Sequence, residues 1–158
     1  MNVKLEDWAV NARTAALILN APLNTLKMWR YRDNLLPQNW VGPGRAPEKC
    51  YQLRDLIQVR VAQKLMSVGV PVSKACQAAN VSHMEPFFRG EQYTFGIGDE
   101  GLRVEYDRDN DVVLSFYLEK DGLRLARAVS DDIAQHRGTD VGDAALDDFL
   151  SEHGFAKS

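Results

Sequence analysis

Polar, basic and aromatic residues recur along residues 22–33 at the spacing of one helix face. Asn24, Lys27, Met28 and Tyr31 are spaced i, i+3, i+4 and i+7, which places them on one side of a helix. An amide, an ammonium group and a phenol on one face can donate hydrogen bonds to base edges and to a phosphate backbone. Spacing alone fits a solvated surface equally well, because charged helix faces commonly face water.

The second of two helical segments carries this face, and a break separates it from the first. Asn11 can cap a helix over residues 12–19, whose apolar residues form one stripe. The break follows because Asn20 tolerates the left-handed conformation and Pro22 suits the first turn of a new helix, over about residues 22–33. The pattern predicts a helix-turn-helix.

The next segment predicts a hairpin and two further helices. Residues 41–51 contain glycines and prolines that cannot continue a helix, so we expect a hairpin or wing that carries Arg45 and Lys49. An amphipathic helix is expected over residues 55–68, with Arg54, Arg60 and Lys64 outside, and Gly69 ends it. A shorter helix over residues 72–79 follows. Leu26, Trp29, Leu35 and Cys76 are expected in the core.

The net charge of −3 combines two unlike halves. Residues 1–90 hold 12 basic and 6 acidic side chains, whereas residues 91–158 hold 7 basic and 16 acidic ones, so the halves carry +6 and −9. This asymmetry indicates a basic module that meets a polyanion and an acidic module with another role.

In the acidic half the spacing of the apolar residues no longer follows a helical period. Short β-rich runs between turn residues predict three or four antiparallel strands, at residues 93–97, 102–106, 112–118 and 123–128. A short helix capped by Ser130 and another over residues 142–154 should follow. The expected fold class is therefore α+β. An all-α winged helix-turn-helix domain (1–80) precedes a linker (81–92) and an acidic module (93–158) with a small antiparallel sheet and C-terminal helices.

Four sequence blocks carry a family resemblance. They are Thr25–Pro37 (TLKMWRYRDNLLP), Lys49–Tyr51 (KCY), Tyr51–Leu56 (YQLRDL) and Lys64–Val72 (KLMSVGVPV). In this order and spacing they resemble the recognition helix, wing end, following helix start and glycine turn of the MerR family of transcriptional regulators. The resemblance covers roughly residues 10–80. The turn at residues 20–22 and Met28 depart from the family pattern, which leaves the base preference open.

The resemblance implies double-stranded DNA as the partner of the first domain. A recognition helix places side chains near its N-terminus in the major groove, while a wing contacts the minor groove or phosphates. Arg30 and Arg32 would only screen the DNA backbone, and Arg45 would reach the minor groove beside a phosphate contact from Lys49. The implied DNA-binding residues are Asn24, Thr25, Lys27, Met28, Arg30, Tyr31, Arg45 and Lys49.

Three functions follow as hypotheses. The first is a sequence-specific regulator of transcription, bacterial or phage-borne. The second is an excisionase-like architectural or DNA-packaging factor, and the third is a protein–protein adaptor whose acidic half binds a basic partner or covers its own DNA face. Residues 81–130 lack the heptad run of the family's dimerisation helix, so we expect a homo-oligomer to form through the acidic module. The alternatives are that the winged domain binds as a monomer or in head-to-tail arrays.

Other classes find no support in the sequence. The aspartates at 107, 109 and 111 resemble the start of a calcium loop, but Val112 replaces the required glycine, so an Asp-rich turn is expected. The three histidines are far apart, and we predict no catalysis, metal or cofactor. Cys50 and Cys76 are too isolated for a disulfide framework. No apolar run could span a membrane and no signal-peptide pattern is present, so a cytoplasmic, nucleoid-associated protein is expected.

Overall fold

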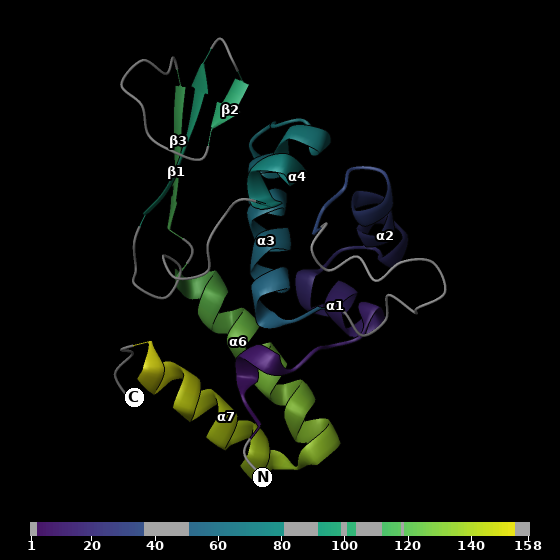
Figure 1. Ribbon diagram of the computed structural model, residues 1–158, viewed down its shortest axis with the longest axis vertical. Helices are drawn as coiled ribbons and strands as arrows, with labels where there is room; N and C mark the ends of the chain where they lie inside the picture. The colour runs from purple at the N-terminus through teal and green to yellow at the C-terminus, as the bar shows by residue number, and fades with distance from the viewer. Residues whose placement is uncertain are drawn as a thin grey trace.

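The computed structural model describes residues 3–36, 51–80, 92–98, 101–103, 112–117 and 119–153, with side chains in 3–36, 51–80 and 120–153. Figure 1 shows the arrangement of the elements. In chain order they are η1 (Leu5–Asp7), α1 (Ala12–Leu19), α2 (Leu23–Tyr31), α3 (Leu53–Ser67), α4 (Val72–Asn80), β1 (Gln92–Gly98), β2 (Gly101–Arg103), β3 (Val112–Tyr117), α6 (Glu119–Arg137) and α7 (Thr139–Glu152).

The helix-turn-helix forms where its local signals predict it. The side-chain oxygen of Asn11 accepts a 2.8 Å hydrogen bond from the backbone N–H of Thr14, which caps α1. Asn20 ends the helix in the left-handed conformation, at φ 51° and ψ 47°. Pro22 then stands as the N-cap of α2, and its carbonyl accepts from the N–H of Leu26 at 3.0 Å.

Two further helices follow at nearly the expected bounds. The backbone N–H of Gln52 donates to the carboxylate of Asp55 at 2.8 Å, which completes a capping box at the start of α3. Gly69, at φ 95°, ends the turn after this helix. Tyr51 forms an antiparallel bridge with Val10, and the rest of the expected wing lies outside the described residues, so the wing stays a prediction.

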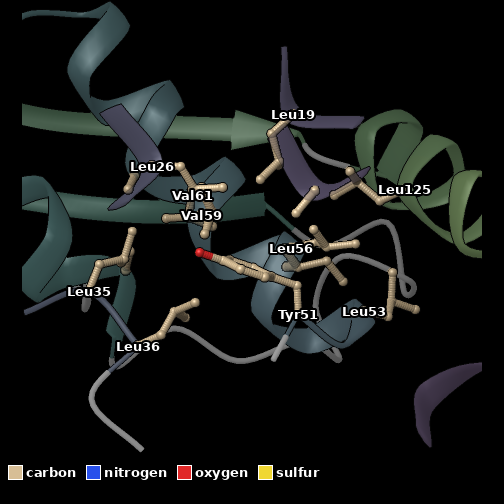
Figure 2. Close-up of a cluster of buried hydrophobic side chains, with 14 of the residues drawn as sticks. Leu19, Leu26, Leu35, Leu36, Tyr51, Leu53, Leu56, Val59, Val61 and Leu125 are labelled. Atoms are coloured by element: carbon tan, nitrogen blue, oxygen red, sulfur yellow. The ribbon is translucent and has the colours of Figure 1, made fainter. Parts of the chain in front are cut away.

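One apolar core joins the first helices to the last two. Figure 2 shows the ring of Tyr51 among leucines and valines of the helix-turn-helix and α3, with Leu125 of α6 beside them. Leu26, Trp29 and Leu35 are buried, which confirms the sequence prediction. The same core cluster continues through Ile133 of α6 and Phe149 of α7. The last two helices therefore pack on the first half of the chain.

The predicted α+β fold class is wrong. Where the structure describes side chains, 78% of the residues are helical and none belongs to a strand. Residues 123–128, expected as a strand, form the middle of α6, and the helix expected at Ser130 is part of the same 19-residue helix. Packing against α3 and α7 explains the difference, because it buries Leu125, Ala126 and Val129 on one helical face.

The backbone of residues 92–98, 101–103 and 112–117 forms three short strands in the order β2-β1-β3, all antiparallel. Figure 1 shows them at one end of the molecule, with β2 near α4. The core residues that the structure describes lie in the helices and in the segments that join them. The proposed linker at 81–92 lies outside the described residues apart from Gln92, so the domain boundary stays a prediction.

Candidate nucleic-acid interface

The face of α2 singled out from its spacing is exposed to solvent. Asn24, Lys27, Met28 and Tyr31 are all exposed, with 57% of Tyr31 accessible, and Thr25 is half-buried beside them. The opposite side of the helix carries the buried Leu26 and Trp29, which fix the rotation of the helix about its axis. The fold therefore presents an amide, an ammonium group, a thioether and a phenol together.

The segments that flank α2 form hydrogen bonds with side chains of other helices. At the C-terminal end, the Asn80 side chain on α4 accepts from the N–H of Leu36 at 2.8 Å and donates to the carbonyl of Asn34 at 2.9 Å. At the N-terminal end, the Gln63 amide on α3 donates to the carbonyl of Leu19, just before the turn, at 2.9 Å. These bonds tie the segments on either side of α2 to α3 and α4.

Arg30 does not lie on the exposed face. Its side chain is only 4% exposed, and its guanidinium carbon lies 4.9 Å from the centroid of the Tyr51 ring, in cation–π geometry. This position corrects the expectation that Arg30 screens a DNA backbone, because the helix turns it toward the core. Arg32 is exposed and lies 3.6 Å from the carboxylate of Asp33.

Exposed basic side chains stand on α1, α2 and α3. Arg13, Lys27 and Arg54 are exposed, and Lys27 has no ion pair among the described residues. Two carboxylates of these elements are withdrawn from solvent: that of Asp55 is buried in the capping box of α3, and that of Asp33, after α2, is nearly buried. Lys27 is an exposed basic group that a phosphate could reach.

The acidic helices do not lie over this face. Helices α6 and α7 pack on η1, and α6 also packs on α3. Figure 1 shows α1 between α2 and the α6–α7 pair. The exposed side of α2 is thus separate from the part of the acidic half that the structure describes.

The two wing residues, Arg45 and Lys49, lie outside the described residues, so their predicted contacts stay predictions. Arg60 and Lys64 were expected on the outside of their helix. Instead, both contact Asp121 of α6, at 3.1 Å and 3.6 Å between the nearest nitrogen and oxygen atoms. No local sequence signal could have identified this partner, because it lies in another part of the chain.

Cys76 is a buried part of the core, as its position on α4 predicts. Burial raises the pKa of the Cys76 thiol to about 12, and the negative charge of Asp33 adds to the effect. Within the described residues, no group of three or more histidine, cysteine or acidic side chains could hold a metal ion. No helix in that part of the chain has the length and apolar character to cross a membrane.

Comparison with known proteins adds no family assignment. No protein-family model matches the chain, and no curated protein matches it at a significant level. The resemblance to MerR-type domains therefore stays a prediction from the sequence blocks, and a function has to be argued from the residues themselves.

Proposed function

We propose that the protein binds double-stranded DNA in a sequence-specific manner and regulates transcription. The observation that carries the proposal is the exposed face of α2, where Asn24, Lys27, Met28 and Tyr31 stand on a helix that follows a short, capped turn. A helix presented in this way fits the major groove, which admits an α-helix and displays a distinct pattern of donors and acceptors for each base pair.

Each exposed side chain has a role suited to its chemistry. Asn24, in the first turn, can make paired hydrogen bonds to adenine, and Lys27 can donate to guanine or to a phosphate oxygen. Met28 offers an apolar contact for a thymine methyl group. The hydroxyl of Tyr31, near the C-terminal end of α2, can donate to a phosphate and fix the register of the helix on the duplex.

The wing supplies the second half of the proposed interface. Arg45 would enter the minor groove and Lys49 would contact a neighbouring phosphate, because arginine is drawn to the negative potential of a narrow minor groove. A homo-oligomer formed through residues 93–158 and a location at the nucleoid belong to the same proposal.

A selection from random duplexes tests this function. The full chain is incubated with a pool of randomised DNA, and bound duplexes are recovered and sequenced. We expect enrichment of one short motif, and we expect Lys27→Ala to change that motif at one position or remove the enrichment. The matched control is Arg127→Ala, which removes a positive charge from the exposed side of α6 and should leave the motif unchanged.

The same experiment addresses the architectural alternative. An architectural or packaging factor would retain DNA of many sequences and enrich no motif, since its affinity comes from the backbone and from DNA deformability. Retention of no DNA at all would contradict both readings and would leave the adaptor hypothesis.

A further inference from the structure

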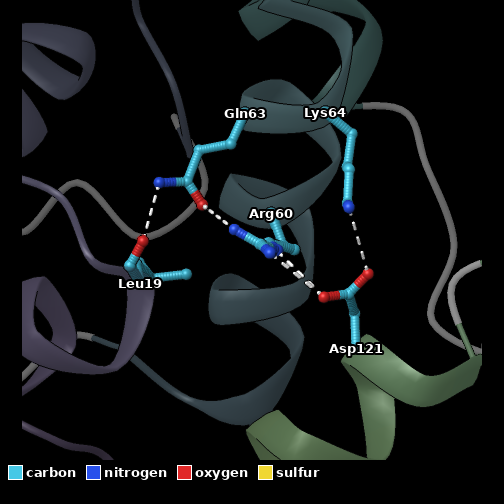
Figure 3. Close-up of polar contacts among 5 residues, drawn as sticks. All are labelled: Leu19, Arg60, Gln63, Lys64 and Asp121. Carbon is cyan, nitrogen blue, oxygen red and sulfur yellow. Dashed lines mark hydrogen bonds and ion pairs between the residues drawn. The ribbon is translucent and has the colours of Figure 1, made fainter. Parts of the chain in front are cut away.

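A chain of polar contacts joins the start of α6 to the turn of the helix-turn-helix, as Figure 3 shows. One carboxylate oxygen of Asp121 accepts from Nε and Nη2 of Arg60, at 3.2 Å and 3.1 Å. The Nη1 group of Arg60 donates to the side-chain oxygen of Gln63 at 3.3 Å. The Gln63 amide then donates to the carbonyl of Leu19 at 2.9 Å.

The carbonyl of Leu19, which accepts the last of these hydrogen bonds, lies where α1 meets the turn. Leu19 is the last residue of α1, and the last carbonyls of a helix have no partner within it. Asn20 and Ala21 fold back on α1, with their N–H groups donating to the carbonyls of Leu17 and Ala16. Only Asn20, Ala21 and Pro22 separate this carbonyl from α2, so the bond from Gln63 helps to set the direction in which α2 leaves.

Arg60 decides which end of the Gln63 amide faces Leu19. A glutamine side chain has an acceptor oxygen and a donor NH₂ group, and a carbonyl can pair only with the donor. Because Arg60 can only donate, it selects the oxygen and leaves the NH₂ group toward Leu19. Asp121, whose second oxygen lies 3.6 Å from Nζ of Lys64, in turn holds the Arg60 guanidinium in place.

We propose that Gln63, oriented by Arg60 and Asp121, is a positioning residue for α2. It holds the turn at residues 20–22 so that the exposed face of α2 is preorganised before it meets its ligand. Asp121 lies soon after β3, so the contact also ties the segment that carries the strands to the helix-turn-helix. The consequence for DNA affinity rests on the proposed function, whereas the ordering of the turn does not.

Amide hydrogen exchange in the full-length protein tests the ordering directly. Gln63→Met keeps an unbranched side chain of similar length but removes the donor. We expect the amides of Asn20 and Ala21 to exchange about fivefold to tenfold faster, the effect of losing one hydrogen bond. Gln77→Met, an exposed change on α4, is the matched control and should leave both amides unchanged. Unchanged exchange in Gln63→Met would overturn the proposal.

The role of Asp121 is tested by its effect on the amides of the turn, which it does not contact directly. Asp121→Asn keeps the shape of the side chain and weakens its hold on Arg60, so we expect faster exchange at Asn20 and Ala21 as well as at the start of α6. Asp131→Asn, at an exposed position on the same helix, is the control. Because both variants act through the same bond, the double variant with Gln63→Met should be less than additive. If only the amides at the start of α6 exchanged faster, Asp121 would have no part in holding the turn.

A DNA titration separates this proposal from the proposed function. Gln63→Met should weaken binding about fivefold with the same slope of log affinity against log salt, because no phosphate contact is lost. A reduced slope in Gln63→Met would contradict a positioning role. If the wild type binds no duplex, the proposed function fails, and the exchange result alone decides whether Gln63 holds the turn.

Discussion

The indole Nε1 of Trp8 donates a 2.8 Å hydrogen bond to the carboxylate of Asp132, across 124 positions of the chain. Trp8 follows η1, and Asp132 lies in the second half of α6 and is 8% exposed. The guanidinium of Arg137 lies 6.0 Å from the centroid of the Trp8 ring. This contact binds the N-terminal segment to α6, so the two segments stabilise each other.

Removal of the indole donor should destabilise the protein. Trp8→Phe leaves the nearly buried carboxylate of Asp132 without this donor, and we expect the free energy of unfolding to fall by about 1–3 kcal/mol. Urea denaturation measures the change. Asp132→Ala in the Trp8→Phe background should cost less than Asp132→Ala alone, because the bond is already absent. Fully additive costs would contradict the coupling.

The close approach of α7 to α6 depends on a glycine. A Cβ atom at Gly142 would lie 2.6 Å from the carbonyl oxygen of Ser130 and 2.9 Å from Cβ of Ala134. We expect Gly142→Ala to lower the melting temperature, because overpacking of about 1–3 kcal/mol exceeds the gain of about 1 kcal/mol in helix propensity. Asp143→Ala, an exposed change beside it, should have little effect. A more stable Gly142→Ala protein would show that the helices separate at no cost.

The fold could be predicted from the sequence where local signals determine it. The bounds of α1 match the prediction because a capping side chain starts the helix and a left-handed Asn20 ends it. The strand prediction for residues 123–128 is wrong because a short apolar run between turn residues does not by itself distinguish a strand from part of a buried helix. In the structure Gly122 lies within α6, where packing on α3 and α7 overrides local preference.

The candidate site, too, could be predicted only where local spacing determines it. The exposed face of α2 follows from helical spacing and the buried Leu26 and Trp29, whereas the burial of Arg30 depends on Tyr51. The ion pair between Arg60 and Asp121 joins the basic and acidic halves, and only tertiary structure brings these residues together.

Arg30 and Arg32 should respond differently to substitution. Arg30→Met removes a nearly buried charge that stacks on Tyr51, and we expect the free energy of unfolding to fall by about 1–2 kcal/mol through the lost cation–π contact. Arg32→Met, at an exposed position, should change it by less than about 0.5 kcal/mol. Denaturant titration of the two variants gives the comparison, and equal effects would contradict the structural role of Arg30.

The Cys76 thiol should be unreactive in the folded protein. Its pKa is raised to about 12, so the folded state keeps the proton that an unfolded chain releases near its ordinary value of 9.0. The resulting stability is fully present below pH 9.0 and is lost as the pH rises toward about 12. We expect alkylation of Cys76 near pH 8 only after unfolding in urea, as measured by peptide mass spectrometry. Rapid alkylation of the native protein would contradict its burial.

The salt dependence of duplex binding tests the central claim most directly. The full chain, Lys27→Ala and the control Arg127→Ala are titrated onto one labelled duplex, chosen by the selection, at several salt concentrations. We predict that affinity falls steeply with salt and that Lys27→Ala weakens binding, with a slope smaller by about 1 if Lys27 contacts a phosphate. Arg127→Ala should match the wild type. Affinity that does not change with salt, or equal binding by all three proteins, would contradict DNA recognition through α2.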